Sequence, residues 1–248
     1  MKLSWCTSTI DIDAFRLRAD VGMKAAHGRP ELTVTQHGND RQPLLGYPES
    51  MQRSFNCSTG DIVLFAHDDV TLLEKDWDLK LLDAFKRIPK LGLAGFAGGK
   101  QLGDFDMYKH PFDLRKMRRY ETRMSLIDWR KHKGARRATR PTRVAMLDGL
   151  ALAVRRDWFQ SIGGWSWFPF PHHGYDLALS CMAARHGLHA YVLPIECHHD
   201  SGKTASSSTY LQSELLTPYG SDAELHRQAH EWVYNEFRDV LPIKTCCG

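Results

Sequence analysis

The sequence has no apolar run that approaches the length of about 20 residues needed for a membrane-spanning helix. Its N-terminus, from Met1 to Cys6, carries a positive charge but no long apolar core, so it lacks the character of a signal peptide. Cysteine is sparse as well. The six cysteines are scattered, without the paired-thiol spacing of a metal site, and we expect them to be reduced and mostly structural. Reduced cysteines are typical of the cytosol, so we expect a cytoplasmic protein.

A strong net charge is also missing. The formal net charge is +4, the hydrophobic fraction is 42% and the charged fraction is 25%, which are ordinary values for a globular chain. A length of 248 residues is enough for one domain with a sizeable core. These numbers favour a single domain of the size common among α/β enzymes.

The charge is unevenly distributed, because basic residues gather between residues 115 and 143. They are Arg115, Lys116, Arg118, Arg119, Arg123, Arg130, Lys131, Lys133, Arg136, Arg137, Arg140 and Arg143. Only Glu121 and Asp128 oppose them. Such a segment attracts phosphate-rich partners, including nucleic acid, anionic headgroups and nucleoside diphosphates, although a solvated basic insertion has the same composition.

The most informative segment is an apolar run, Ile62 to Ala66, that ends in His67-Asp68-Asp69. The run is short and rich in β-forming residues, which predicts a buried strand. Two adjacent carboxylates where a buried strand ends are costly unless something positive lies on them, and hard oxygen ligands suit Mg²⁺ or Mn²⁺. The alternative is a solvated loop in which Asp68 or Asp69 caps the next helix.

Strands and helices alternate along the first hundred residues. Apolar patterns and turn residues predict strands over residues 2–7, 31–36, 62–66 and 91–97, and helices over residues 13–26, 49–57 and 77–87. In the first helix we expect Phe15, Leu17, Val21 and Ala25 to form the apolar side. Alternation of this kind is typical of a mainly parallel sheet flanked by helices, in which ligands bind beyond the carboxyl ends of the strands.

The second half repeats this arrangement. An apolar segment over residues 143–154 is interrupted at Asp148-Gly149, where the glycine allows a bend or a close approach of the backbone. A short helix over residues 156–162 and an aromatic loop from Trp165 to Pro171 follow. His172-His173-Gly174-Tyr175-Asp176 then leads into a helix that reaches residue 186. Asp176 in the first turn complements the helix dipole, or it acts as a general base in the cleft.

A further strand, beginning at Tyr191, ends in His198-His199. Neutral imidazole is a good ligand for Mn²⁺ and similar ions, and neighbouring residues of a strand point to opposite sides, so we expect one of the two histidines to coordinate. The polar segment 201–209 has the composition of a flexible loop. The last helix is predicted over residues 221–240. One side of it, core or dimer face, is formed by Leu225, Ala229, Trp232, Val233 and Phe237.

The order of these motifs resembles that of the family-2 glycosyltransferases with the GT-A fold. The shared pieces are the acidic strand end, the Asp-Gly strand followed by Arg155-Arg156, Gly-Gly-Trp, His-Gly-Tyr-Asp and the final His-His, together covering Leu3 to Gly202. The resemblance implies an α/β fold in which residues 1–220 form the glycosyltransferase domain. Residues 1–99 would be the nucleotide-binding half, residues 100–220 the acceptor-binding half, and residues 221–248 a C-terminal helix and tail.

The resemblance also implies roles for particular residues. Asp69 matches a metal ligand, His198 or His199 matches the C-terminal metal-binding histidine, and Asp176 matches the base that deprotonates the acceptor hydroxyl. His67 stands where the family has the first carboxylate of its Asp-x-Asp element, so this chain departs from the family pattern there. Positions that match contacts to the donor nucleotide or sugar are Thr7, Ser8, Asn39, Asp40, Asp68 and Gly149, and Asp148 matches a contact to the donor sugar or the acceptor.

The activity implied is metal-dependent transfer of a sugar from a nucleoside-diphosphate sugar, with a UDP-sugar as the expected donor, to an acceptor hydroxyl with inversion. The cation would be Mn²⁺ or Mg²⁺. The sequence has no Gln-x-x-Arg-Trp element of processive synthases, which favours a single transfer. The basic segment suits a polyanionic acceptor such as a glycan, a lipid-linked phosphate or modified nucleic acid. Two other classes fit parts of the pattern: a non-catalytic nucleic-acid-binding protein that uses residues 115–143, and a nucleotidyltransferase.

Overall fold

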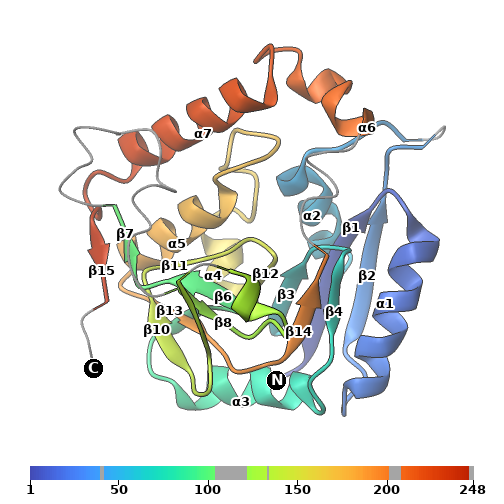
Figure 1. Ribbon diagram of the computed structural model, residues 1–248, viewed down its shortest axis with the longest axis vertical. Helices are drawn as coiled ribbons and strands as arrows, with labels where there is room; N and C mark the ends of the chain where they lie inside the picture. The colour runs from blue at the N-terminus through green and yellow to red at the C-terminus, as the bar shows by residue number, and fades with distance from the viewer. Residues whose placement is uncertain (40–41, 104–121, 133, 201–207, 246–248) are drawn as a thin grey trace.

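The strand predicted over residues 62–66 forms β3 (Ile62–Ala66), inside a seven-stranded sheet (Figure 1). The architecture comes from a computed structural model that describes the chain except for residues 40–41, 104–121, 133, 201–207 and 246–248. The strand order is β10 (Thr142–Val144), β13 (His189–Val192), β5 (Leu91–Gly95), β12 (Ala151–Arg155), β3, β1 (Leu3–Thr9) and β2 (Glu31–Gln36).

The sheet is mostly parallel in strand direction, as the sequence predicts. β1, β2, β3, β5 and β13 all run one way, while β12 and the edge strand β10 run the other way. β12 lies between β3 and β5 and is antiparallel to both. The carboxyl ends of β1, β2 and β3 therefore meet at one edge of the sheet, where ligands bind in folds of this kind.

Helices cover both faces of the sheet, because alternate residues of each strand point to opposite sides. Ile62, Leu64 and Ala66 of β3 join a core with α1 (Ile12–Ala25) and α3 (Trp77–Arg87). Val63 and Phe65 join the opposite core, which contains α2 (Tyr47–Asn56), α4 (Arg156–Ser161), α5 (Tyr175–Arg185) and α7 (Asp222–Glu236). The predicted helices are thus all present, with ends shifted by a few residues.

The apolar side predicted for the first helix is wrong at two positions. Leu17 is 75% exposed and Val21 is 43% exposed, whereas the buried residues of α1 are Phe15, Ala19 and Gly22. The physical reason is close packing against large aromatics: a Cβ on Gly22 would lie 3.1 Å from the Trp5 ring. Small residues at the helix–sheet contact let α1 approach the sheet, and the larger apolar side chains turn outward.

Several short strands lie outside the large sheet. The predicted strand over residues 91–97 divides after Gly95 into β5 and β6 (Ala97–Gly99), so the prediction of a single strand there was wrong. β6 lies in a small sheet with β11 (Met146–Leu147), β8 (Thr122–Met124) and β9 (Ala135–Arg137). A third, two-stranded sheet pairs β7 (Gln101–Leu102) with β15 (Ile243–Lys244).

The strand predicted from Tyr191 to the histidine pair is likewise two strands. β13 ends at Val192 in the large sheet, and β14 (Cys197–His199) pairs instead with β4 (Val70–Leu72). Pro194 lies in the connection, and proline has no backbone N–H to continue a ladder. The break redirects the chain, so that the histidine pair lies beside the segment that follows β3.

The C-terminal helix packs as core. Val233 and Phe237 are fully buried in the core that contains Val63 and Phe65. Trp232 stacks on Trp167 of the aromatic loop with ring centroids 6.1 Å apart. Among the described residues, the remaining regular elements are the short helix α6 (Ser208–Leu211) and 3₁₀ turns at Trp129–Lys131 and Glu214–Leu216. Most of the polar segment 201–209, and residues 115–121 and 133 of the basic segment, lie outside the described residues. Across the described ranges, the helices are too short or too polar to traverse a bilayer.

Candidate functional site

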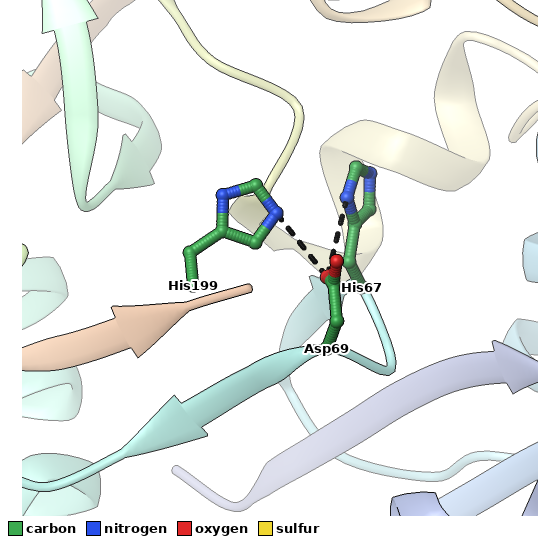
Figure 2. A group of neighbouring side chains, drawn as sticks. All are labelled: His67, Asp69 and His199. Atoms are coloured by element: carbon green, nitrogen blue, oxygen red, sulfur yellow. Dashed lines mark ion pairs between the residues drawn. The ribbon is translucent and has the colours of Figure 1, made fainter. Parts of the chain in front are cut away.

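Three potential metal ligands converge where β3 ends. The chain leaves β3 through His67-Asp68-Asp69 and enters β4 at once, and the antiparallel register of β14 places His199 opposite Val70. His199 Nε2 lies 3.2 Å from Asp69 Oδ1, and His67 Nδ1 lies 4.0 Å from the same oxygen (Figure 2). The three ligand atoms lie within 4.8 Å of one another. Two segments far apart in the sequence therefore build one cluster.

The residue at the centre of the cluster is Asp69, which is 7% exposed. Its Oδ1 is buried and receives no hydrogen bond of regular geometry among the described residues, although His199 lies close. Burial acts to raise the pKa of this carboxyl, but its contact with His199 and the nearby His67 outweigh that effect, and the pKa is lowered. Burial alone would lower the pKa of His199, but Asp69 and Asp148 raise it above its usual value. The pair therefore favours an ionised carboxylate that can meet a cation.

His67 has two different neighbours. Its Nε2 is 2.7 Å from the hydroxyl of Tyr175, the first residue of α5, while Nδ1 faces Asp69. Burial lowers the pKa of His67, against the raising charges of Asp69 and Asp148, so the ring is neutral near neutral pH. Burial also raises the pKa of the Tyr175 hydroxyl well above its usual value. A neutral imidazole and a neutral hydroxyl share this hydrogen bond.

The donor set fits a divalent cation. One carboxylate oxygen and two imidazole nitrogens suit Mn²⁺ and similar ions, which accept mixed oxygen and nitrogen ligands. The buried Asp69 Oδ1 without a regular hydrogen bond is the kind of polar atom that a bound ion satisfies. His67 enters the cluster although the sequence marked it only as a departure from the family pattern. The available signal was the position of His67 two residues before Asp69, because this spacing places both side chains on one loop.

Asp68 has a different environment from Asp69. Its Oδ2 accepts a hydrogen bond of 2.6 Å from the Thr9 hydroxyl, and the Arg18 guanidinium lies 3.4 Å from its backbone oxygen. Burial raises the pKa of this carboxyl above its usual value, and the Thr9 hydrogen bond opposes the rise. The two adjacent carboxylates therefore differ in role: Asp69 lies in the cluster, and Asp68 is tied to the end of β1.

A cavity of about 210 Å³ opens beside the cluster. Its lining residues come from the ends of β1 and β2, the start of α2, the histidine loop before α5, and α6. They include Ser8, Thr9, His37, Tyr47, His67, Asp68, Asp69, His172, His199 and Tyr210. Of these, His37, Tyr47, His172 and Tyr210 were assigned no role from the sequence, because histidines and aromatics outside a recognised ligand pattern are more often part of the core.

The predicted nucleotide contacts divide into two groups. Ser8 and Asp68 line the cavity. Thr7, however, is fully buried and donates its hydroxyl to Ala66 O at 2.8 Å, and Asn39 accepts from the Gln42 N–H at 3.1 Å within a tight turn. Asp40 lies outside the described residues. Thr7 therefore ties β1 to β3, and its hydroxyl is occupied.

The predicted residues Asp148, Gly149 and Asp176 lie together on the α5 side of the cluster. The Asp176 carboxylate accepts the N–H of Gly149 at 3.2 Å and that of Leu177 at 2.9 Å. Asp148 Oδ1 accepts the Leu150 N–H at 3.2 Å, and its charge acts on both His67 and His199. Within the described parts of the chain, none of these three residues lines the cavity.

The histidine pair divides as strand geometry requires. His199 joins Asp69, whereas His198 Nδ1 lies 3.5 Å from Asp200 Oδ1 on the other side of β14. The cluster of candidate ligands within the described residues contains His199 but not His198. Asp200 also pairs with Arg18 at 3.3 Å, which ties the end of β14 to α1.

Comparison with known proteins agrees with this architecture. Residues 46–217 match a glycosyltransferase-like family. A search of curated proteins finds no match. Among solved structures, GalNAc-T7 with UDP, GalNAc and Mn²⁺ is similar with a TM-score of 0.55 and 11% identity. That match covers 96% of this chain but only 57% of the other.

Two further structures are similar at lower scores. The mannosyltransferase PcManGT from Pyrobaculum calidifontis, in complex with GDP-Man and Mn²⁺, has a TM-score of 0.49 and 13% identity, covering 97% of this chain and 74% of that one. Glucosyl-3-phosphoglycerate synthase from Mycobacterium tuberculosis, with Mg²⁺ and UDP, has a TM-score of 0.46 and 14% identity, covering 82% and 72%.

The fold, a mostly parallel sheet with a cluster of one carboxylate and two imidazoles at the carboxyl end of β3, is that of a GT-A glycosyltransferase. The family match spans more than half of the sequence, and the chain belongs to the glycosyltransferase-like family. The predicted class of enzyme is thereby confirmed.

Proposed function

We propose that this enzyme transfers a sugar from a nucleoside-diphosphate sugar to an acceptor hydroxyl, with a divalent cation held by Asp69, His199 and His67. The observation that carries the proposal is the convergence of these three ligand atoms beside the cavity at the ends of β1 and β2. The donor's nucleoside occupies that cavity, and its diphosphate lies toward the cation. Residues 1–99 supply most of the donor contacts, and residues 100–220 hold the acceptor.

The proposed cation is Mn²⁺ or Mg²⁺, and a UDP-sugar is the first donor to test. When bound, the cation would neutralise the charge that develops on the departing diphosphate. Two similar solved structures carry UDP and one carries GDP-Man, each with Mn²⁺ or Mg²⁺. The mixed carboxylate and imidazole ligands of this chain favour Mn²⁺ over Mg²⁺, which prefers oxygen ligands alone.

Asp176 is the proposed general base. Two backbone N–H groups orient its carboxylate, and its helix begins with the residue that contacts His67. Asp176 takes the proton from the acceptor hydroxyl as that oxygen bonds to the anomeric carbon. The bond from this carbon to the diphosphate oxygen breaks, and its electron pair leaves with the nucleoside diphosphate. Attack on the face opposite the leaving group inverts the anomeric configuration.

The proposed acceptor is polyanionic. Arg123 of β8 and Arg136 of β9 are in register in a parallel pair, and Arg130, Arg140 and Arg143 are exposed nearby in the sequence. Arg137, also on β9, is exposed and pairs with Glu196 at 2.9 Å. Adjacent guanidinium groups form a surface that favours phosphate or carboxylate groups. Inhibition of transfer by added salt, steeper for a charged than for a neutral acceptor, would support this choice.

A thermal-shift experiment tests the donor and the metal together. The protein is melted with UDP, GDP and their sugars, each with and without Mn²⁺, alongside the Asp69→Asn variant, which keeps the side-chain shape. A ligand at 100 times its Kd stabilises the folded state by about 2.7 kcal/mol. We expect a rise in Tm that needs both nucleotide and Mn²⁺ in the wild type, and a much smaller rise in Asp69→Asn.

Two results would contradict the proposal. Consumption of a nucleoside triphosphate with release of pyrophosphate would indicate a nucleotidyltransferase. Duplex-DNA binding that weakens steeply with salt, with no stabilisation by any nucleotide, would indicate a nucleic-acid-binding protein.

A further inference from the structure

The hydroxyl of Tyr175 contacts the ring nitrogen of His67 that faces away from the metal cluster. Its oxygen lies 2.7 Å from His67 Nε2, while His67 Nδ1 lies 4.0 Å from Asp69 Oδ1. We propose that Tyr175 is a positioning residue that holds the His67 ring in the orientation that offers Nδ1 to the cation. This inference rests on the proposed function, because it assumes that the cluster binds a metal.

The argument begins with the two nitrogens of a neutral imidazole. One carries the proton and donates, and the other has the lone pair that a metal requires. If His67 Nε2 carries the proton, it donates to the Tyr175 oxygen and leaves the Nδ1 lone pair directed at the cluster. If Nδ1 carries the proton instead, the same tyrosine donates to Nε2, so the contact survives metal removal. A hydroxyl serves both states, because it is both donor and acceptor.

Tyr175 itself is held firmly. Its ring stacks on Tyr47 with centroids 4.0 Å apart and an interplanar angle of 19°, and it is 5% exposed. Tyr47 in turn meets the His67 ring edge to face at 5.3 Å. The three rings therefore form a closed group, in which the hydroxyl of Tyr175 cannot move far from His67 without disturbing the stack.

Gly149 leaves space for the Tyr175 side chain because it has no Cβ. A Cβ added at Gly149 would lie 2.7 Å from Tyr175 Cζ, closer than real side chains allow, and still closer to the hydroxyl. This explains in physical terms why a glycine interrupts the apolar segment between β11 and β12. The Asp148-Gly149 break leaves space for the tyrosine that the His-Gly-Tyr-Asp motif supplies, so two separate motifs of the sequence support a single ligand.

Outer partners of metal-bound histidines hold the ring and set its tautomer, and their loss weakens metal binding by about 10- to 100-fold. Tyr175→Phe keeps the ring stack but removes the oxygen, which leaves a buried Nε2 without its partner. We therefore expect this variant to bind Mn²⁺ about 10- to 100-fold more weakly than the wild type. Its fold should be retained, since the aromatic packing is unchanged.

The experiment measures Mn²⁺ affinity by electron paramagnetic resonance in the presence of UDP, for the wild type, Tyr175→Phe and Tyr234→Phe. Tyr234 lies on α7 beneath the Arg238 guanidinium, belongs neither to the described ligand cluster nor to the cavity lining, and serves as the matched control. Steady-state kinetics should show the defect of Tyr175→Phe as a raised Mn²⁺ requirement, largely restored at saturating Mn²⁺.

A second measurement needs no variant. Nuclear magnetic resonance of ¹⁵N-histidine-labelled wild-type protein with Zn²⁺ should show His67 protonated at Nε2 and metal-bound through Nδ1. Binding through Nε2 would overturn the inference, as would equal Mn²⁺ affinity in the wild type and Tyr175→Phe, while leaving the metal site intact. Failure of the wild type to bind any Mn²⁺ would instead overturn the proposed function and, with it, this role.

Discussion

His199 Nε2 lies 3.2 Å from Asp69 Oδ1, across the short antiparallel pair of β14 and β4. That pairing determines which of two adjacent histidines joins the cluster, because neighbouring strand residues point to opposite sides. His198 pairs with Asp200 instead. The pairing register of these two three-residue strands thus determines which histidine can bind the metal.

The first prediction separates the two histidines. His199→Gln removes an imidazole from the cluster, and we expect loss of measurable Mn²⁺ binding at concentrations that saturate the wild type. His198→Gln is the matched control, since it changes the same residue type one position away. It should bind Mn²⁺ with nearly unchanged affinity. Calorimetric titration of both variants is the measurement, and the opposite ranking would show that the register does not determine the ligand.

The second prediction concerns Gly149. Gly149→Ala forces the Tyr175 ring or the backbone of the break to shift, and overpacking of this kind costs about 1–3 kcal/mol of stability. Gly99→Ala is the control, because its new methyl group would meet the nearest atom, Met146 Sδ, at an ordinary 3.4 Å. Unfolding in urea gives both free energies. Equal stabilities for the two variants would mean that the contact with Tyr175 is not limiting.

The third prediction concerns Asp176. Asp176→Asn retains the side-chain shape but cannot accept the acceptor proton, so we expect sugar transfer to fall by about 10²–10⁴-fold with little change in Tm. Asp157→Asn is the control: Asp157 also accepts the N–H of the next residue in the first turn of a helix, at 2.7 Å. Transfer by Asp176→Asn at the wild-type rate would remove this residue from the chemistry.

The fourth prediction concerns pH and His172. Burial lowers the pKa of His172 from 6.5 to about 3, with the charges of His173 and His67 adding to the effect. Between those two values the unfolded chain holds a proton on His172 and the folded chain does not. The free energy of unfolding therefore falls as the pH falls through this range, by about 1.4 kcal/mol per pH unit from this group alone.

The measurement is a series of denaturant unfolding curves from pH 4 upward, each compared between wild type and variant. His172→Gln removes the titrating group, so its stability should depend on pH less steeply than that of the wild type below pH 6.5. His186→Gln, at an exposed histidine, is the control for the substitution itself. An equal slope in wild type and His172→Gln would show that this ring is not the source of the pH dependence.

Much of the fold was predictable because its elements have clear local signals. Three elements have the expected bounds: the strands at Ile62–Ala66 and Glu31–Gln36 and the helix at Trp77–Arg87. The face of α1 was not predictable, because Leu17 and Val21 follow helical spacing but the sheet demands small residues at Ala19 and Gly22. Close packing of Trp5 on this helix is a tertiary effect that spacing does not reveal.

The candidate site was predicted in outline. Asp69 and His199 do meet, and Asp176 does lie in the first turn of a helix beside the Asp-Gly break. His67 was harder to predict, because its value as a ligand depends on a tyrosine more than a hundred residues away. Thr7 shows the opposite difficulty. Its position at the end of β1 predicted a ligand contact, but the hydroxyl is used between strands.

The position of β12 has a consequence for how the chain reaches its native state. β3 and β5 are not neighbours, because β12 is inserted between them and bonds to both. Residues up to Gly99 alone would leave two strand edges facing a gap, so on a ribosome the middle of the sheet closes only after residue 155 has emerged. Pairing between such distant segments slows folding. An emerging chain therefore exposes unpaired strand edges that can pair with other chains, and chaperones protect such edges.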